Sequence, residues 1–513
     1  MGALFVAGGT DFCLDDAWIH LSYAKSLLAG DGLSYNPGDH ETGFSSPLWV
    51  LLLAAWPHGS DPVVAVKMLG VLFHAASAWL GATLALELAV RGASLERPVP
   101  AAAVALLAGS LVATQPHALV AAVSGMEVSV TSALLLGFGL ALVRNAWGVA
   151  ALVAALSVWA RPESLAFVLP MAGLRALEEV RGERLDGFRD RLLALLRRAG
   201  LVGAAALAAM AAWMLYTQVV SGHPLPNTFY VKTQVETGTG SWSFFVERVA
   251  AIEPWLLGVG GLLLLALAVR GEARARRGFV PSWILAWLLA MLAIGLSRPL
   301  NSATTFYESR YFAIFGALPL IAVALGWAHL GAATPVTPDG QPDASAPKPS
   351  AWPRRLGALA LLPVVLLSGT LAVELRERTQ AQEVDIRLLH TDPAEWIAHN
   401  LPDDARIAVE GAGAIRHRAP RSMRVIDALG LNDRRIAHAP DTPAKVCALI
   451  AADPTHFALP DQLARPLARV FDLEPLEAFV DPHYSLVDPP IAMRVQVYRR
   501  VGTNPAWLQR CSP

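Results

Sequence analysis

Two adjacent carboxylates, Asp15 and Asp16, stand near the start of a chain that is otherwise mostly apolar. Acidic side chains beside a bilayer are costly unless water solvates them or the protein uses them. One carboxylate of such a pair can take the proton of an attacking hydroxyl, while the other orients it, tunes its pKa or binds a cation. His20, four residues after Asp16 on the same helical face, is a candidate helper. The spacing predicts proton-transfer chemistry at a membrane surface.

Further polar side chains stand where apolar segments end, and several of them are cationic. Arg and Lys can stabilise the charge that develops on a departing phosphate. The predicted topology brings all of these residues to the outer ends of helices, where a polar site could converge. Besides His20, the candidates for substrate binding are Glu127, Arg161, Glu163, Asn227, Tyr230, Lys232 and Arg310.

The acidic candidates and the Arg-Pro-Glu segment also have structural interpretations. Asp15 could cap the helix that begins near Ala17, because aspartate is a favoured N-cap. Glu127 could be a helix-start carboxylate that the helix dipole stabilises. Arg161 and Glu163 could pair with each other at the break that the intervening proline makes.

The remaining candidates have structural alternatives as well. Lys232 and Arg310 could be interface anchors whose charged ends reach water. Asn227 and Tyr230 could order their own loop rather than touch a substrate, and a lone histidine such as His20 is more often structural than functional. Both interpretations stay open at this point.

Composition indicates a membrane protein. Of 513 residues, 54% are hydrophobic and 16% charged, whereas soluble proteins have about 25% charged residues. A net charge of −1 argues against a nucleic-acid partner, which would require a basic surface. Three cysteines do not make a disulfide scaffold. The sequence has no C-x-x-C or H-x-x-x-H spacing, so a structural zinc site is not expected. No cofactor is certain. A divalent cation bound by Asp16 is an alternative.

The apolar runs predict a polytopic α-helical membrane protein with about 10–11 transmembrane helices, because a span needs about 20 apolar residues. The segment Pro47–Trp56 is too short to span and is expected to lie in the interface or to re-enter. Charge and proline at Arg161-Pro162-Glu163 predict two helices that meet at a break near the membrane surface. The runs are 62–90, 101–122, 128–143, 147–160, 163–174, 199–220, 254–269, 280–297, 311–330 and 356–373.

Positive charge predicts the orientation. With the Asp15-Asp16 loop outside, the inside connections carry about 17 Lys and Arg and the outside ones about 6, which follows the positive-inside rule. The site then faces the extracytoplasmic side of a bacterial inner membrane. The expected outer segments are 10–45, 221–253 and 374–513, and the expected cytoplasmic ones are 175–198 and 331–355.

Two domains are predicted. Residues 1–373 form a transmembrane catalytic domain, in which a Pro-, Ala- and Ser-rich stretch at 331–355 is a flexible cytoplasmic linker loop. Residues 374–513 form a soluble extracytoplasmic α/β domain, in which Cys447 and Cys511 could pair in an oxidising compartment. Its strand-like runs are Arg406–Val409, Arg424–Ile426, His456–Leu459 and Met493–Tyr498, with a helix at Pro393–Asn400.

A glycine-containing segment, Glu410-Gly411-Ala412-Gly413-Ala414, follows the first of these strands. A dinucleotide-binding turn would need a third glycine, and Arg416 stands in that place. The segment therefore predicts a tight strand-to-helix turn rather than a nucleotide site.

The stretch Asp15–Trp49 resembles the first extracytoplasmic loop of the GT-C membrane glycosyltransferases. It is most similar to the terminal β-arabinofuranosyltransferase group of mycobacteria, whose pattern runs D-D-A-[aromatic]-I, Y-A, G-x-G-L, N-P-G and G-[aromatic]-[ST]-S-x-L-W. The matching residues are Asp15 to Ile19, Tyr23-Ala24, Gly30 to Leu33, Asn36-Pro37-Gly38 and Gly43 to Trp49.

Later elements resemble the same family in the same order. They are Ser124-Gly125-Met126-Glu127, Arg161-Pro162-Glu163, His223–Lys232, the segment Asn301–Tyr311 that contains Arg310, and the run VIDALGLNDRRIAH. The resemblance implies that Asp15, the first acid, is the catalytic base and that Asp16 orients it or binds a cation. In the family a full helix precedes the paired acids, whereas Met1–Gly9 is only half a span.

The prediction is therefore an inverting GT-C glycosyltransferase. Its partners would be a polyprenyl-phosphate sugar donor, with arabinofuranose the nearest-family choice, and a glycan, lipid or protein acceptor. Alternatives are a hexosyl- or mannosyltransferase of the same fold, a transporter or flippase for lipid-linked sugars, or a structural or sensory membrane protein. Transporters often show internal repeats and charges at mid-membrane; here no repeat is evident and the charges gather at one face, which favours an enzyme.

Overall fold

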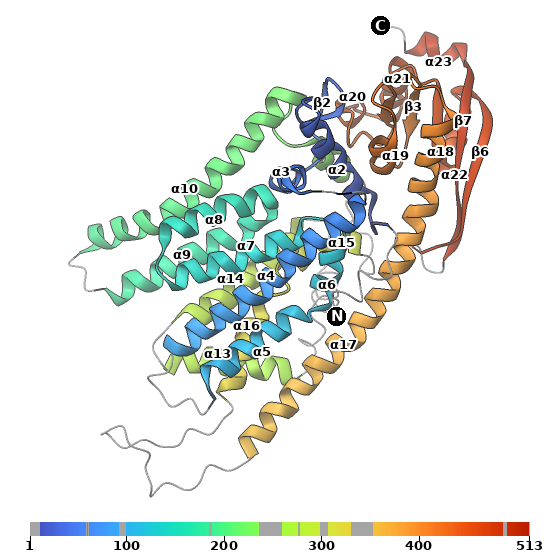
Figure 1. The fold of residues 1–513 in the computed structure, drawn as a ribbon. Helices are drawn as coiled ribbons and strands as arrows, with labels where there is room; N and C mark the ends of the chain where they lie inside the picture. Colours follow the sequence, from blue (N-terminus) through green and yellow to red (C-terminus); the bar gives the residue numbers. More distant parts are fainter. Residues whose placement is uncertain are drawn as a thin grey trace, which may run out of the picture.

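The computed structural model describes residues 11–57, 59, 61–91, 99–183, 187–234, 259–274, 278–297, 306–329, 352–485 and 490–511. A helical part and a C-terminal sheet domain make up the described chain (Figure 1). Several predictions fall outside these residues: the half-span Met1–Gly9, the residues Asn301–Thr305 and most of the linker at 331–355.

Apolar sequence forms the helical part. Proline occupies the first turn of α3 and α6, a position where its missing N–H removes no helix bond. The helices are α2 (Asp15–Leu28), α3 (Pro47–Ala55), α4 (Pro62–Arg91), α5 (Ala101–Ala113), α6 (Pro116–Val123), α7 (Val128–Val143), α8 (Trp147–Ala160), α9 (Leu165–Gly182), α10 (Phe188–Ser221), α11 (Asn227–Gln234), α13 (Val259–Arg274), α14 (Phe279–Ser297), α15 (Phe306–Ala313), α16 (Leu318–Ala328) and α17 (Trp352–Ile386), with a 3₁₀ turn η1 (Pro162–Ser164).

Within the described ranges, four helical stretches are each long and apolar enough to cross a bilayer: α4, α10, most of α14, and Leu359–Asn400, which begins inside α17. The pair α5 and α6 passes the same test jointly but bends by 57°, with Pro116 at the start of α6. Further apolar helices, such as α7, α8 and α16, are shorter. The total of about 10–11 spans stays a prediction.

The break at Arg161-Pro162-Glu163 is confirmed. The helix α8 ends at Ala160, Arg161 is extended with φ −154° and ψ 122°, and η1 then leads into α9. This turn points the Arg161 side chain out of the regular helix surface, so that it can reach residues on other helices.

The C-terminal domain is built on a five-stranded mixed sheet of order β4-β3-β5-β7-β6. Strand β3 pairs in parallel with β4 and β5, whereas β7 pairs antiparallel with β5 and β6. The elements are η3 (Arg387–Thr391, a π turn), α18 (Asp392–Asn400), β3 (Arg406–Val409), α19 (Ala412–Arg418), β4 (Arg424–Asp427), α20 (Arg434–Ala437), α21 (Thr442–Ala451), β5 (His456–Pro460), α22 (Asp461–Leu467), β6 (Phe471–Tyr484), β7 (Ile491–Thr503) and α23 (Pro505–Arg510).

The sequence predicted four of these strands, the helix α18 and the tight turn between β3 and α19, and all are present. It missed β6, which contains Pro475 and Pro482. Proline is tolerated in edge strands because the missing N–H then faces away from a partner, and β6 is an edge of the sheet. Cys447 and Cys511 form a disulfide, as the sequence allowed.

The helix α17 connects the two parts. At 1.5 Å per residue its 35 residues span about 52 Å, more than a bilayer core. In Figure 1 it runs along the whole helical part and reaches the sheet domain, which lies beside α2 at one end of the molecule. The predicted domain boundary at residue 374 falls inside this helix.

The first loop docks onto the sheet domain. The Asn36 side chain pairs with both backbone groups of Val425 in β4, donating to its carbonyl oxygen (3.0 Å) and accepting from its N–H (2.9 Å). The Tyr23 hydroxyl donates to the Asn432 side-chain oxygen at 3.0 Å. Contact is so close at Gly43 that a Cβ there would lie 1.7 Å from Asn432 Oδ1. The glycine and asparagine of this loop therefore serve the interface between the two parts.

Candidate active site

A pocket with about 370 Å³ of empty volume lies where the first loop meets the ends of several helices. Six of the ten predicted site residues line it: Asp16, His20, Glu127, Arg161, Lys232 and Arg310. The other lining residues are Ile19, Gly43, Phe44, Ser45, Met126, Thr228 and Tyr311. Segments that are far apart in the sequence thus converge, as the prediction of a shared polar site required.

Of the two adjacent acids, Asp16, in the first turn of α2, faces this pocket. Its Oδ2 lies 2.9 Å from Arg310 Nη2 and 3.2 Å from Lys232 Nζ. Burial alone would raise the pKa of Asp16, but the Lys232 and Arg310 charges outweigh it and hold the pKa well below its usual range. The carboxylate therefore stays ionised between its two cations at neutral pH.

Lys232 is carried by the short helix α11, and the first loop positions that helix. The backbone N–H of Asn227, at the start of α11, donates to the Thr42 carbonyl oxygen at 3.1 Å. Thr228 and Lys232, four residues apart and thus on one helical face, both line the pocket. Arg310 comes from α15 and is 2% exposed, so its charge is held inside the protein rather than at a lipid interface.

Asp15, the acid that the resemblance implied as the base, does not line this pocket. Its carboxylate accepts hydrogen bonds from the backbone N–H groups of Gly413 (2.7 Å) and Ala414 (2.9 Å) in the first turn of α19. A Cβ at Gly413 would lie 2.2 Å from the Asp15 carbonyl oxygen, so only glycine fits this approach. Asp15 makes no side-chain cap on its own helix, whose N-cap is Leu14. It caps a helix of the other domain instead.

His20 lies beside Asp16 in the pocket, as the i+4 spacing predicted. The side chain is buried, and among the described residues neither ring nitrogen has a hydrogen-bond partner. Burial lowers the pKa of His20, although Glu127 and Asp16 act in the opposite direction. A neutral imidazole aimed into a polar pocket can exchange hydrogen bonds with a bound hydroxyl.

Arg161 joins two acids at the inner wall of the pocket. Its Nη1 lies 2.9 Å from Glu127 Oε1, and its Nε lies 3.4 Å from Glu163 Oε2. The guanidinium also stands 4.7 Å from the Tyr311 ring centre. Arg161 and Glu163 thus do pair at the proline break, as the structural interpretation proposed, and Glu163 itself does not line the pocket.

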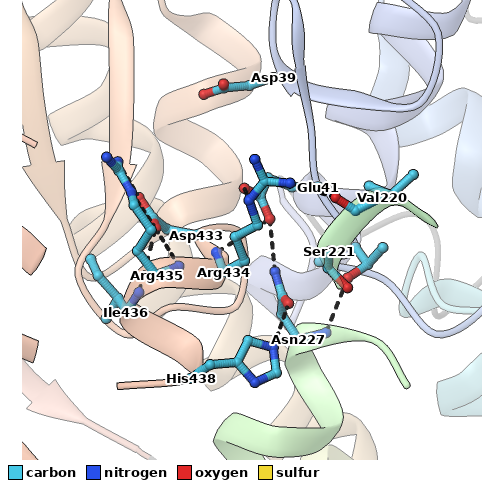
Figure 2. Close-up of polar contacts among 12 residues, drawn as sticks. Asp39, Glu41, Val220, Ser221, Asn227, Asp433, Arg434, Arg435, Ile436 and His438 are labelled. Carbon is cyan, nitrogen blue, oxygen red and sulfur yellow. Dashed lines mark hydrogen bonds and ion pairs between the residues drawn. The ribbon is translucent and has the colours of Figure 1, made fainter. Parts of the chain in front are cut away.

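Asn227 and Tyr230 face the C-terminal domain rather than the pocket. The Asn227 amide donates to Glu41 Oε2 at 2.9 Å, and its oxygen lies 3.3 Å from His438 Nε2 (Figure 2). The Tyr230 ring centre is 4.5 Å from that of His438. Both residues therefore lie at the contact between α11 and α20.

The donor set around Asp16 does not resemble a metal site. Among the residues that the structure describes, no group of three or more His, Cys, Asp or Glu side chains could hold a metal ion. The Asp16 carboxylate, where a divalent cation was considered, instead contacts two cationic side chains.

Sequence reasoning missed part of the pocket lining. Tyr311 follows Arg310 directly and stands against Arg161, so the Arg-Tyr pair was the available signal. Gly43, Phe44 and Ser45 belong to the first-loop motif but were not named as site residues. Burial raises the pKa of Glu41 to about 7. No local sequence pattern indicated this residue, because its hydrogen-bond partners lie on distant segments.

Comparison with solved structures identifies the fold. The crystal structure of ArnT from Cupriavidus metallidurans bound to undecaprenyl phosphate matches with a TM-score of 0.56 at 14% identity, covering 96% of this chain and 95% of that one. The oligosaccharyltransferase AglB from Archaeoglobus fulgidus, in complex with an inhibitory peptide and a dolichol-phosphate, matches with a TM-score of 0.51 at 11% identity, covering 90% and 67%. The chain therefore has the GT-C membrane fold with a C-terminal sheet domain, as predicted from the sequence.

Two sequence comparisons add little about function. Residues 374–504 match a family described as a domain of unknown function, DUF8728. No curated protein matches the chain. The fold and the apolar helices together indicate a multi-pass membrane protein.

Proposed function

We propose that the protein is an inverting glycosyltransferase that moves a sugar from a polyprenyl-phosphate donor to an extracytoplasmic glycan or lipid acceptor. The observation that carries the proposal is the pocket in which Asp16 lies between Lys232 and Arg310. A carboxylate beside two cations provides a proton acceptor next to a site for a phosphate, which is what this transfer needs.

The cations supply the donor site. A lipid phosphate is a strong anion, and charge-assisted hydrogen bonds from Lys and Arg are the natural way to hold it. The structures of ArnT and AglB, which share the fold, are complexes with undecaprenyl phosphate and a dolichol-phosphate. By that analogy the lipid would enter from the bilayer, with its phosphate against Lys232 and Arg310.

Asp16 then serves as the base. Lys232 and Arg310 lower its pKa, which makes it a weak proton acceptor. A donor phosphate shares those two cations, so the pKa of Asp16 rises towards the working range as the donor binds. The acceptor oxygen attacks the anomeric carbon, the bond from that carbon to the phosphate oxygen breaks, and the hydroxyl proton passes to Asp16. One displacement inverts the configuration and releases polyprenyl phosphate.

The proposed orientation of the protein in the membrane rests on the sheet domain and on the distribution of positive charge. The Cys447–Cys511 disulfide is typical of an oxidising compartment, and the basic connections are expected in the cytoplasm. The sheet domain and the pocket lie at the same end of the molecule, since Asp15 of the first loop contacts α19. We therefore place the pocket on the extracytoplasmic side of a bacterial inner membrane.

The sugar is inferred from the first-loop motif. The stretch Asp15–Trp49 resembles the terminal β-arabinofuranosyltransferases, which makes arabinofuranose the first donor to test. A hexosyl donor is the alternative within the same fold. Protein purified in lipid nanodiscs would be incubated with polyprenyl-phosphate arabinofuranose, mannose and glucose and a neutral octyl disaccharide. Mass spectrometry should detect addition of a single sugar, with the pentose preferred; no product from any donor would refute the proposal.

A further inference from the structure

We propose that a cluster in which the exposed Arg434 and the half-buried His223, Tyr230 and His438 lie over the buried Glu41 and Asn227 is the subsite that holds a neutral glycan acceptor. The inference rests on the proposed glycosyl transfer and names the place where the second substrate binds. Four segments supply the cluster: the first loop, the connection from α10 into α11, α11 itself, and α20 of the sheet domain with the residue that follows it. Figure 2 shows Glu41, Asn227, Arg434 and His438 of this cluster.

The location fits an acceptor. Glu41 and Asn227 adjoin residues that line the Asp16 pocket, namely Gly43 on the first loop and Thr228 on α11. The two faces of α11 thus serve two purposes, because Thr228 and Lys232 face the pocket while Asn227 and Tyr230 face α20. The cluster and the pocket are therefore neighbours along the first loop and along α11.

The polar groups suit hydroxyl recognition. The Glu41 carboxylate accepts from the Asn227 amide at 2.9 Å and from the Arg434 backbone N–H at 3.2 Å, and it lies 3.9 Å from Arg434 Nε. Burial raises the pKa of Glu41 to about 7, so both its protonated and ionised forms exist near neutrality. Such a carboxyl group can donate to or accept from a hydroxyl, and the exposed Arg434 guanidinium adds N–H donors.

The rings suit the apolar faces of a sugar. The His223 and His438 rings are stacked with centres 3.4 Å apart, and Tyr230 meets His438 edge-on at 4.5 Å. Burial, and to a smaller extent the neighbouring His223, lower the pKa of His438 to about 4. The His438 ring is therefore neutral at pH 7. Neutral aromatic rings beside a few directed polar groups are the usual composition of a small-molecule site.

The balance of charge argues for a neutral ligand. Each carboxylate here faces one arginine: Glu41 faces Arg434, Asp433 lies 3.2 Å from Arg435, and Asp39 pairs with Arg424. No positive charge is left over for a phosphate among these three pairs. This contrasts with the Asp16 pocket, where two cations share one carboxylate.

Arg434 and Arg435 offer a matched pair of variants for the test. They are neighbours on α20 with side chains 50% and 49% exposed, but Arg434 approaches Glu41 whereas Arg435 pairs with Asp433 (Figure 2). Arg434→Gln should raise the acceptor KM about tenfold, the value of a lost charge-assisted hydrogen bond. His438→Gln should do the same, whereas Arg435→Gln should leave the acceptor KM unchanged. The donor KM and hydrolysis of the donor by water should stay at wild-type values in all three.

Binding is measured as well as activity. Saturation-transfer NMR with an octyl arabinofuranosyl disaccharide should show contact with the wild type and with Arg435→Gln, and a weaker signal with Arg434→Gln and His438→Gln. Normal acceptor KM and normal NMR contact in both latter variants would overturn the subsite, as would tenfold better competition by a phosphorylated disaccharide. Failure of the wild type to use any donor would instead refute the proposed function, so the two failures are distinguishable.

Discussion

Replacing Asp15 by asparagine is expected to loosen the sheet domain and to spare most of the chemistry. The carboxylate accepts from Gly413 N–H at 2.7 Å and from Ala414 N–H at 2.9 Å. Hydrogen bonds to charged groups are each worth about 1.5–3 kcal/mol net, and an anion at a helix start adds about 0.3–1 kcal/mol. Asparagine keeps one acceptor oxygen and loses the charge, so we expect a loss of about 2–4 kcal/mol in docking.

This loss is large against the stability of a typical domain, about 5–15 kcal/mol. Thermal unfolding and limited proteolysis of purified Asp15→Asn should show earlier release of residues 374–513. Its turnover at saturating substrates should remain within about tenfold of wild type, whereas Asp16→Asn should lose about 10²- to 10⁴-fold, as for a general base. Asp404→Asn, which changes an exposed carboxylate of the sheet domain, is the matched control. A stable Asp15→Asn variant with a hundredfold loss of turnover would refute the assignment and restore Asp15 as the base.

Three further predictions follow from the charges. Lys232→Gln should raise the donor KM about tenfold with little change in the acceptor KM, because it removes a phosphate contact. Kinetics with each substrate varied in turn would check this, with Arg465→Gln, which changes an exposed arginine of the sheet domain, as a control that should behave as wild type. An unchanged donor KM would remove Lys232 from the donor site. Burial raises the pKa of Glu41 from an ordinary 4.5 to about 7, so the stability that is full below pH 4.5 is lost as the pH rises through 7. The wild-type melting temperature should fall from pH 5 to pH 8, and it should fall less in Glu41→Gln. Burial also raises the pKa of Asp427 to about 7 and that of Asp385 to about 6, so these groups contribute to the slope that remains. An identical slope in the variant would contradict this cause. Finally, an impermeant thiol reagent applied to intact cells should label Ala468→Cys and not Ser350→Cys, and the reverse pattern would invert the proposed orientation.

Local patterns in the sequence predicted what depends on neighbouring residues. The i+4 spacing placed His20 beside Asp16, and the proline at position 162 predicted the helix break that presents Arg161. Alternation and β-branched residues predicted β3, β4, β5 and β7. These features follow from helix geometry, proline chemistry and strand propensity, which act over a few residues.

Contacts between distant segments were not predictable from local patterns. Asp15 and Gly413 are 398 residues apart, and nothing near either residue indicates that the acid caps α19. A capping preference was visible, but the sequence suggested the wrong helix. The same applies to Glu41, whose pKa is raised by burial and whose hydrogen-bond partners lie on α11 and α20. The edge position of β6 depends on the order of the whole sheet, so no local pattern showed that a strand could contain its two prolines.

The central claim, that Asp16 activates an acceptor beside a bound lipid phosphate, has a direct test. Wild-type, Asp16→Asn and Asp404→Asn proteins in nanodiscs would be mixed with one equivalent of polyprenyl-phosphate arabinofuranose and excess octyl disaccharide, and a single turnover would be followed by mass spectrometry. We predict transfer by the wild type and Asp404→Asn, and a rate at least about a hundredfold lower in Asp16→Asn, although donor binding is retained. Equal single-turnover rates in Asp16→Asn and wild type would contradict the account.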